Sequence, residues 1–362
     1  MNLSPLKLGD LLVKIPIIQG GMGVGVSGAS LAAAVANEGA VGVISSVQIG
    51  YREDDFDINP AEANIRALVN EIKKARSLSP NGILGVNIMV ATNNYKEAVL
   101  ACVKEKIDVI ISGAGLPSNL PELVKDSCTK IIPIVSSGKA AATITKMWTK
   151  KYDYVPDAVI VEGPEAGGHL GFSAEDLASP ELPSLKDIVT DVIESLKPYE
   201  ETFNRKIPVI AAGGIFTGSD IGEFIMLGAS GVQMGTRFVA TEECDAHINF
   251  KMAYVNAKKE DVQLVKSPVG LPGRAIRNKF VESLENSNIP VSRCWNCLKP
   301  CNPASTPYCI SMALINSVKG DVDNGLIFSG SNVYRIDRIV TVKELINELV
   351  TDANAYLADK TI

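Results

Sequence analysis

The chain contains two histidines, and His169 lies where a group that transfers protons would be expected. It ends the segment Glu162-Gly163-Pro164-Glu165-Ala166-Gly167-Gly168-His169, which follows a short apolar run typical of a buried strand. Imidazole exchanges protons near neutral pH, so His169 is a candidate general acid or base. A loop histidine that makes only structural hydrogen bonds is the alternative. His247 lies in a helix-like stretch after the last apolar run, and we expect it to be structural.

Glycine-containing sequences end three further apolar runs. Gly213-Gly214 follows the run Pro208–Ala212, and Gly235-Thr236 follows the run Gly231–Met234. Free backbone N–H groups at such ends, near the start of a helix, favour a phosphate group, although tight turns alone would also account for the glycines. The first run ends in Gln19-Gly20-Gly21-Met22-Gly23-Val24-Gly25, where glycine lets the backbone approach a flat ligand closely.

Four of the seven cysteines lie close together, in the pattern Cys294-x₂-Cys297-x₃-Cys301-x₇-Cys309. Four thiolates over such a short stretch can converge on a tetrahedral zinc ion or on a [4Fe-4S] cluster. Pro303, shortly after the third cysteine, gives the run some likeness to iron–sulfur sequences, although the full spacing matches no standard pattern. Metal-free thiols are the alternative. The odd total and the uneven distribution argue against a disulfide framework.

Eight short apolar runs alternate with helix-like stretches up to about residue 245, and this order predicts a parallel sheet. Eight units favour a closed TIM (β/α)₈ barrel, with functional groups at the carboxyl ends of its strands. An open dinucleotide-binding sheet is the alternative, because Gly23, Gly25 and Gly28 have a G-x-G-x-x-G-like spacing. No acidic residue ends a neat second strand about 20 residues later, as that fold requires. The predicted strands are Ile15–Gln19, Val41–Ser45, Gly85–Met89, Val109–Ser112, Ile131–Val135, Ala158–Glu162, Pro208–Ala212 and Gly231–Met234.

Beyond residue 245 the alternation stops. We therefore expect two regions, a barrel over residues 1–245 and a mostly helical C-terminal extension over residues 246–362 that carries the cysteines and caps the barrel mouth. Helices are predicted at about Asp245–Ala257, Ile310–Val318 and Val342–Tyr356, the last one packing back on the barrel. A Pro- and Gly-containing segment, Ser267–Arg274, is expected to connect the first of these helices to the cysteine cluster.

The net charge and the hydropathy of the chain argue against some classes of binding partner. A net charge of −6 and a pI near 5.2 argue against a dedicated binder of nucleic acid or of anionic membranes. The N-terminus does not resemble a signal peptide, and no apolar run has the roughly 18 to 20 residues that would span a bilayer. We expect a cytoplasmic protein that acts on a small-molecule substrate.

The chain resembles the nitronate monooxygenase (2-nitropropane dioxygenase) family, which includes the flavin-dependent enoyl-acyl carrier protein reductases. Five motifs in order over nearly the whole barrel carry this resemblance. They are Pro16-Ile17-Ile18-Gln19-Gly20-Gly21-Met22, Gly85-Val86-Asn87-Ile88-Met89, Glu162-Gly163-x-Glu165-Ala166-Gly167-Gly168-His169, Pro208-Val209-Ile210-Ala211-Ala212-Gly213-Gly214-Ile215 and Gly231-Val232-Gln233-Met234-Gly235-Thr236-Arg237-Phe238.

The resemblance implies a non-covalent FMN across the barrel mouth, with His169 as the catalytic residue. It implies that Gly213, Gly214, Gly235 and Thr236, after the last two strands, hold the phosphate. Further residues of the barrel loops are implied to surround the ring and the ribityl chain. The implied cofactor-binding residues are Gly21, Met22, Gly23, Asn87, Ser137, Glu162, Ala166, Gly167, Gly168, Gly213, Gly214, Gln233, Gly235 and Thr236. The implied flavin would give a cluster at the cysteines an electron-transfer partner, which favours iron–sulfur over zinc.

Two activities are consistent with the resemblance. The first is oxidation of alkyl nitronates with O₂. The second is NAD(P)H-dependent reduction of enoyl thioesters carried on acyl carrier protein. The segments Ser112–Gly115, Ala275–Asn278 and Lys319–Asp323 resemble the reductase branch of the family. A non-catalytic sensor of a phosphate-containing ligand is a third hypothesis. Acyl carrier protein as a partner and a homodimer both stay open, and the cysteine cluster fits neither activity.

Overall fold

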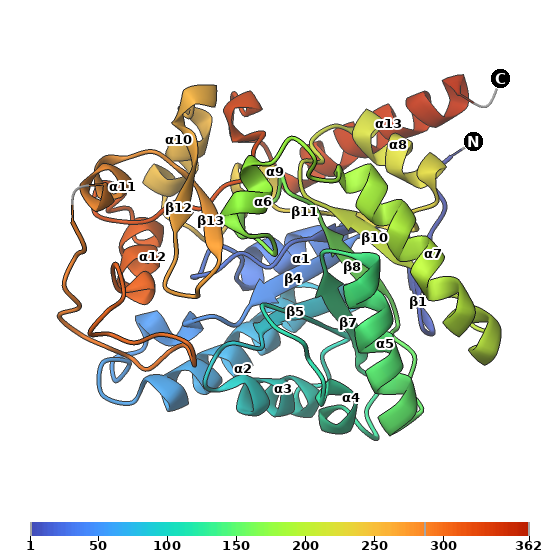
Figure 1. Ribbon diagram of the computed structural model, residues 1–362, viewed down its shortest axis with the longest axis horizontal. Coiled ribbons are helices and arrows are strands. Elements are labelled where there is room, and N and C mark those ends of the chain that lie inside the picture. Colours follow the sequence, from blue (N-terminus) through green and yellow to red (C-terminus); the bar gives the residue numbers. More distant parts are fainter. Residues whose placement is uncertain (1, 286, 361–362) are drawn as a thin grey trace.

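Eight parallel strands close into a barrel at the centre of the molecule (Figure 1). The computed structural model describes residues 2–285 and 287–360. Neighbouring strands follow the order β10-β11-β3-β4-β5-β6-β7-β8, and β8 pairs with β10 to complete the ring. All eight predicted strands are present, so the predicted (β/α)₈ barrel is confirmed. Their bounds are β3 Ile17–Gln19, β4 Val41–Ser45, β5 Ile83–Met89, β6 Val109–Gly113, β7 Lys130–Val135, β8 Val159–Glu162, β10 Val209–Ala212 and β11 Gly231–Met234.

Helices surround the barrel and cover the outer face of its strands (Figure 1). Nearly every residue of the barrel strands is buried, because one face packs on these helices and the other fills the barrel. This two-sided burial explains why the strands are continuous apolar runs in the sequence. The helices are α1 Ala29–Asn37, α2 Pro60–Leu78, α3 Tyr95–Lys104, α4 Leu120–Leu123, α5 Gly138–Tyr152, α6 Ala174–Ala178, α7 Leu185–Phe203, α8 Gly218–Leu227 and α9 Thr236–Val239.

An N-terminal hairpin that the sequence did not predict closes one end of the barrel. Strands β1 (Leu6–Leu8) and β2 (Leu11–Val13) pair in antiparallel fashion around a turn at Gly9, whose φ is +60°. Leu6, Leu8 and Val13 are buried in one cluster with residues of the barrel interior. The hairpin therefore seals the amino-terminal end of the strands and leaves their carboxyl ends open for a site.

The C-terminal extension contains the expected helices and, in addition, a small antiparallel sheet. Strand β13 lies between β12 and the two-residue strand β9 (Gly168–His169), which belongs to the loop after β8. The sequence analysis missed this sheet because Pro272 and Gly273 open β13, and both residue types disfavour strands. The elements are α10 Ile248–Val255, β12 Val262–Lys266, β13 Pro272–Ile276, α11 Lys279–Leu284, α12 Ile310–Val318 and α13 Val342–Asp359.

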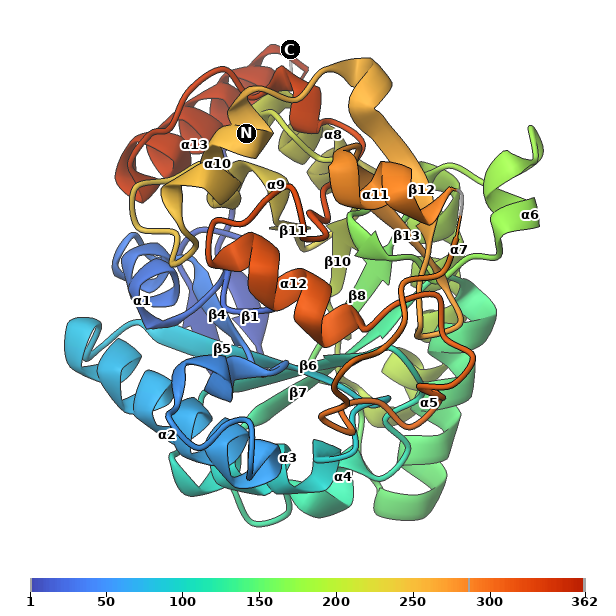
Figure 2. The ribbon, with the colours of Figure 1, turned by 90° about the vertical axis from the view of Figure 1, so that its left-hand side faces the viewer.

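The extension contacts the barrel at several places. Figure 2 views the molecule from the side of the extension, with α12 lying across the opening of the barrel. The closing helix α13 packs along α8, where Asp352 accepts hydrogen bonds from the backbone N–H (2.7 Å) and the hydroxyl (3.0 Å) of Ser219. Buried side chains of both regions form one continuous cluster. The division of the chain at residue 245 stays a prediction.

No helix within residues 2–285 and 287–360 is long and apolar enough to cross a membrane.

Candidate active site

A cavity of about 300 Å³ lies at the carboxyl ends of the barrel strands, beneath the extension. This volume is at the lower end of the range of roughly 300 to 1,000 Å³ that is typical of small-ligand sites. His169 and thirteen of the fourteen residues expected around a flavin line it. These thirteen are Gly21, Met22, Gly23, Asn87, Glu162, Ala166, Gly167, Gly168, Gly213, Gly214, Gln233, Gly235 and Thr236.

Ser137 is the exception among the predicted cofactor residues. Its hydroxyl is the N-cap of α5 and accepts a hydrogen bond from the backbone N–H of Ala140 at 3.2 Å. It is absent from the cavity lining. Serine is a preferred N-cap because its oxygen satisfies one of the free N–H groups of the first turn. Ser137 therefore starts α5, and its contact with the flavin stays a prediction.

The loop after β3 forms one wall of the cavity and is packed against the neighbouring strand. A Cβ atom at Gly21 would lie 2.2 Å from the Cβ of Asn87, so only glycine fits at that position. The Ser27 hydroxyl holds the loop in shape, since it accepts from the Met22 N–H at 2.8 Å and donates to the Met22 carbonyl at 3.2 Å. The glycines of this loop therefore serve close packing of the backbone beside the cavity.

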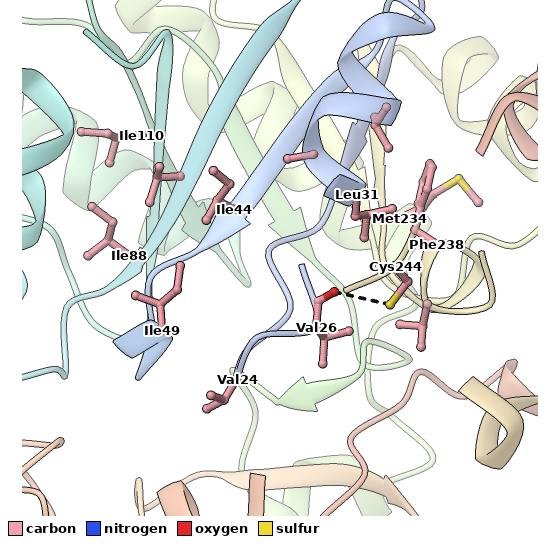
Figure 3. Packing of buried hydrophobic residues seen from close by; sticks show 14 of the residues in the cluster. Val24, Val26, Leu31, Ile44, Ile49, Ile88, Ile110, Met234, Phe238 and Cys244 are labelled. Carbon is pink, nitrogen blue, oxygen red and sulfur yellow. Dashed lines mark hydrogen bonds between the residues drawn. The ribbon is translucent and has the colours of Figure 1, made fainter. Parts of the chain in front are cut away.

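The segment after α9 that contains Asp245 makes hydrogen bonds to the end of the loop after β3. The carboxylate of Asp245 accepts hydrogen bonds from the N–H groups of Gly28 (2.8 Å) and Leu31 (3.1 Å) at the start of α1. Figure 3 shows the adjacent thiol of Cys244 directed at the Val26 carbonyl, among buried apolar side chains. Asp245 thus caps α1 from a distant part of the chain and fixes where the loop ends.

The turns after β10 and β11 form the opposite end of the cavity. Gly213 and Gly214 have φ values of +100° and +84°, which are favourable only for glycine. The extension supports both turns, because the Asn332 amide donates to the Gly214 carbonyl (2.6 Å) and the Gly330 N–H donates to the Thr236 hydroxyl (3.1 Å). No Lys or Arg is among the lining residues of this cavity. An anion at this end would therefore depend on backbone N–H groups and hydroxyls.

His169 is held between two residues of the extension. Its Nε2 lies 2.7 Å from the Ser267 hydroxyl, and its ring contacts the Phe328 ring edge-on at a centroid distance of 5.0 Å. Burial lowers the pKa of His169 to about 4, because the charged imidazolium loses its hydration. The side chain is therefore neutral at pH 7 and able to accept a proton.

Glu162 is a second titratable side chain in the cavity with a shifted pKa. Burial raises its pKa to about 7, and a hydrogen bond from the Gly171 N–H (3.1 Å) acts in the opposite direction. A carboxyl group with this pKa is present in both protonation states at neutral pH. The site thus combines a neutral imidazole with a carboxyl group that can hold or release a proton.

Two orphaned polar atoms provide a test of whether the expected flavin fits. The buried side-chain oxygens of Gln233 and Ser329, both of which line the cavity, have no hydrogen-bond partner in the described part of the chain. Such atoms are costly to bury unless a ligand or water satisfies them. The Gln233 oxygen accepts hydrogen bonds, and the imide N–H of an isoalloxazine ring is a donor. The residues present therefore fit FMN.

The four clustered cysteines do not form a metal-holding group in this structure. Cys294 is exposed, while Cys297, Cys301 and Cys309 are half-buried, and Cys297 lines the cavity. Across residues 2–285 and 287–360, no three or more Cys, His, Asp or Glu side chains are arranged to hold a metal ion. Burial instead raises the pKa of Cys297 to about 11, which favours the protonated thiol. The zinc or iron–sulfur site stays a prediction without structural support.

Part of the cavity wall comes from residues that the sequence analysis did not single out. They belong to the extension, which follows the last barrel motif in the chain. Ser267 lies in the segment Ser267–Arg274, which was expected only to connect a helix to the cysteine cluster. Its position beside β9 follows from the β12–β13 sheet, which was not predicted from the sequence. The apolar part of this wall consists of Phe250, Tyr254, Val269, Ile310, Leu314 and Phe328.

The chain is similar to known proteins over nearly its whole length. A family model described as nitronate monooxygenase matches residues 4–352. The chain is 27% identical over 373 residues to the (3aS,4S,5R,7aS)-5-hydroxy-7a-methyl-1-oxo-octahydro-1H-indene-4-carboxyl-CoA dehydrogenase of Rhodococcus jostii, covering 94% of this chain and 93% of that protein. It is 28% identical over 310 residues to the probable nitronate monooxygenase of Staphylococcus aureus, covering 76% and 78%.

Among solved structures, FabK of Thermotoga maritima has a TM-score of 0.75 and 28% identity, with 96% of each chain covered. The match extends over the barrel and the extension together, since it leaves only 4% of this chain unmatched.

Proposed function

The chain belongs to the nitronate monooxygenase family and is an FMN-dependent oxidoreductase, and we propose that it oxidises alkyl nitronates with O₂. The observation that carries this proposal is the neutral, partly enclosed imidazole of His169 at the carboxyl ends of the strands. The nitronate itself is already deprotonated, but it is in equilibrium with the neutral nitroalkane, whose α-carbon is weakly acidic, so a neutral base beside that carbon would form the nitronate in the site.

Each part of the cavity has a role in this proposal. Bound FMN supplies the two-electron chemistry. The N–H groups after β10 and β11 would hold its phosphate, and the loop after β3 with Asn87 would lie against its ring. His169 moves a proton at the substrate carbon, and the wall formed by α10 and α12 keeps water away from that carbon. Gln233 orients the bound ring by accepting a hydrogen bond.

A second candidate activity is NAD(P)H-dependent reduction of an enoyl thioester. It is favoured by the Rhodococcus jostii relative, whose name describes a coenzyme A thioester and which matches 94% of the chain. The apolar side chains of Phe250, Tyr254 and Leu314 in the cavity wall would suit an acyl chain. In this reaction His169 would donate the proton to the product, and acyl carrier protein or coenzyme A would carry the substrate. The sensor hypothesis is dropped, because the family consists of enzymes.

The two histidines offer a matched test of the proposed role. His169→Gln is expected to lower turnover of neutral 1-nitropropane by about 10²- to 10⁴-fold while flavin content and turnover of preformed propyl nitronate are retained, since a general base is lost. His247→Gln is the control, because His247 is exposed, caps α10 by accepting from the Asn249 N–H (3.1 Å), and is absent from the cavity lining. Steady-state oxygen consumption measures both. Equal activity of the two variants on 1-nitropropane would refute a catalytic role for His169.

A further inference from the structure

We propose that Arg274, which does not line the cavity, supplies the positive charge that stabilises the FMN phosphate there, and that it acts through the loop after β8. Arg274 is a positioning residue in this account, because its side chain donates its hydrogen bonds to backbone carbonyls of that loop. The inference rests on the binding of FMN. It does not depend on whether the substrate is a nitronate or an enoyl thioester.

The guanidinium of Arg274 is bonded to the loop that connects β8 to β9. Its Nη1 donates to the Pro164 carbonyl at 2.8 Å and to the Ala166 carbonyl at 2.5 Å. The backbone of Arg274 lies beside the same loop, because β13 pairs with β9 and Arg274 is the partner of Gly168. Arg274 therefore fixes this loop both through its side chain and through the sheet.

The bonded part of the loop lies at the end of the cavity where the phosphate is expected. A Cβ atom at Gly213 would lie 3.0 Å from the Ala166 nitrogen, so Ala166 is packed against the turn after β10. A Cβ atom at Gly167 would lie 2.6 Å from the nitrogen of Gly330, whose N–H is bonded to the turn after β11. The two loop residues thus lie beside both turns, and Arg274 is bonded to the first of them.

Arg274 also sets the direction of the Gly167 N–H. In a planar trans peptide the carbonyl and the N–H point in opposite directions. Because the Ala166 carbonyl accepts from Arg274, the N–H of the same peptide, which belongs to Gly167, points away from the guanidinium. This N–H makes no hydrogen bond in the described part of the chain, and Gly167 lines the cavity. It is therefore a free backbone donor for an anion.

The charge of Arg274 has no carboxylate partner. Arg274 is half-buried, and it makes no ion pair within residues 2–285 and 287–360. Arg237, which directly follows the turn after β11, is instead paired with Glu348 at 2.9 Å. The carboxylate of Glu165 accepts from the Ser331 hydroxyl at 3.1 Å. A charge held partly away from water is costly without a partner, and an anion in the cavity supplies one.

Affinities for FMN and for riboflavin, which lacks the phosphate, test this role. Fluorescence titration of the full-length apoprotein with each flavin gives the two Kd values. Arg274→Gln keeps an amide donor but loses the charge, so it should weaken FMN binding about tenfold and leave riboflavin binding unchanged. Arg274→Lys keeps the charge and should retain the affinity for FMN.

Arg76→Gln is the matched control for loss of an arginine. Arg76 also donates to a backbone carbonyl, that of Gly82 at 2.7 Å, and it is bonded to Asp108 at 2.6 Å. It is absent from the cavity lining and lies at the amino-terminal end of β5. Both flavins should bind this variant with unchanged affinity.

Equal FMN affinities in Arg274→Gln and Arg274→Lys would overturn the proposal. An equal loss of FMN and riboflavin affinity in Arg274→Gln would also overturn it, since that result marks a purely structural role. If Arg274→Gln does not fold, Glu165→Gln replaces it. Glu165 lines the cavity, and a Cβ atom at Gly214 would collide with its carboxylate.

Removal of the Glu165 charge should strengthen FMN binding about tenfold relative to riboflavin binding. An unchanged ratio would overturn the proposal, because a charge effect that is absent at the turn itself is absent for Arg274 behind it. The proposed function fails separately. A protein that shows the predicted flavin affinities but does not oxidise propyl nitronate retains the role of Arg274 and loses the nitronate activity.

Discussion

Burial shifts the pKa of His169 and of Glu162, two of the titratable side chains that line the cavity. It lowers the pKa of His169 to about 4 and raises that of Glu162 to about 7. Position in the sequence was enough to select His169, because it follows a strand end and a glycine pair. The sequence could not reveal Ser267 as its partner, since that contact depends on three strands separated by about 100 residues. The N-cap role of Ser137 was likewise not predicted from the sequence.

The shifted pKa of His169 predicts a specific dependence of stability on pH. The unfolded chain has a histidine pKa near 6.5, so it binds a proton more readily than the folded protein between pH 6.5 and pH 4. The neutral side chain therefore contributes stability above pH 6.5 that is lost as the pH falls. From pH 7 to pH 5 this single group should lower the free energy of unfolding by about 2 kcal/mol.

Urea unfolding of the holoenzyme and of His169→Gln at both pH values measures this contribution, since other titrating groups cancel in the difference. His169→Gln should lose less stability than the unmodified protein on acidification. Equal losses in the two proteins would contradict a buried, neutral His169.

Turns and caps at the ends of elements shape the cavity more than the elements themselves do. The strands were predictable because each is a buried apolar run. The hairpin β1–β2 and the strands β12 and β13 were not, because each is five residues or fewer and lacks clear alternation. The glycine pair at the end of β10 could be found from sequence, because the φ values of Gly213 and Gly214 require that residue type.

Gly213→Ala tests the turn after β10. Its φ of +100° is costly for alanine, and the new Cβ would lie 3.0 Å from the Ala166 nitrogen and 3.1 Å from the Gly163 oxygen. We expect flavin affinity to fall about tenfold or more, corresponding to roughly 1.4 kcal/mol. Gly228→Ala is the matched control, since its φ is +109° but it lies at the far end of α8. Fluorescence titration of apoprotein with FMN measures both, and equal affinities would contradict the account of this turn.

Asp245→Ala tests the distant cap on α1. It removes the acceptor for N–H groups at the helix start, so we expect the free energy of unfolding to fall by about 2 kcal/mol. The loop after β3 should also lose its anchor, with weaker flavin binding as a consequence. Asp54→Ala is the control, because Asp54 is exposed and makes no side-chain hydrogen bond or ion pair in the described part of the chain. Thermal unfolding compares the two, and similar midpoints would argue against the cap.

At the scale of the whole molecule, the barrel and the extension build the site together. The barrel supplies the strand ends, and the extension supplies Ser267, Phe328 and the wall formed by α10 and α12. The barrel and its family could be predicted from five motifs, whereas the place of the extension over the opening depends on long-range packing that no local pattern encodes. The family model and the Rhodococcus jostii relative both match the barrel and the extension together.

Anaerobic stopped-flow absorbance tests the central claim most directly. Mixing the holoenzyme with propyl nitronate without O₂ should bleach the flavin absorbance within the time of one turnover. NADH should not bleach it at a comparable rate. Rapid bleaching by NADH followed by reoxidation with a crotonyl thioester, with no response to the nitronate, would contradict the account and establish the enoyl-thioester reductase in its place.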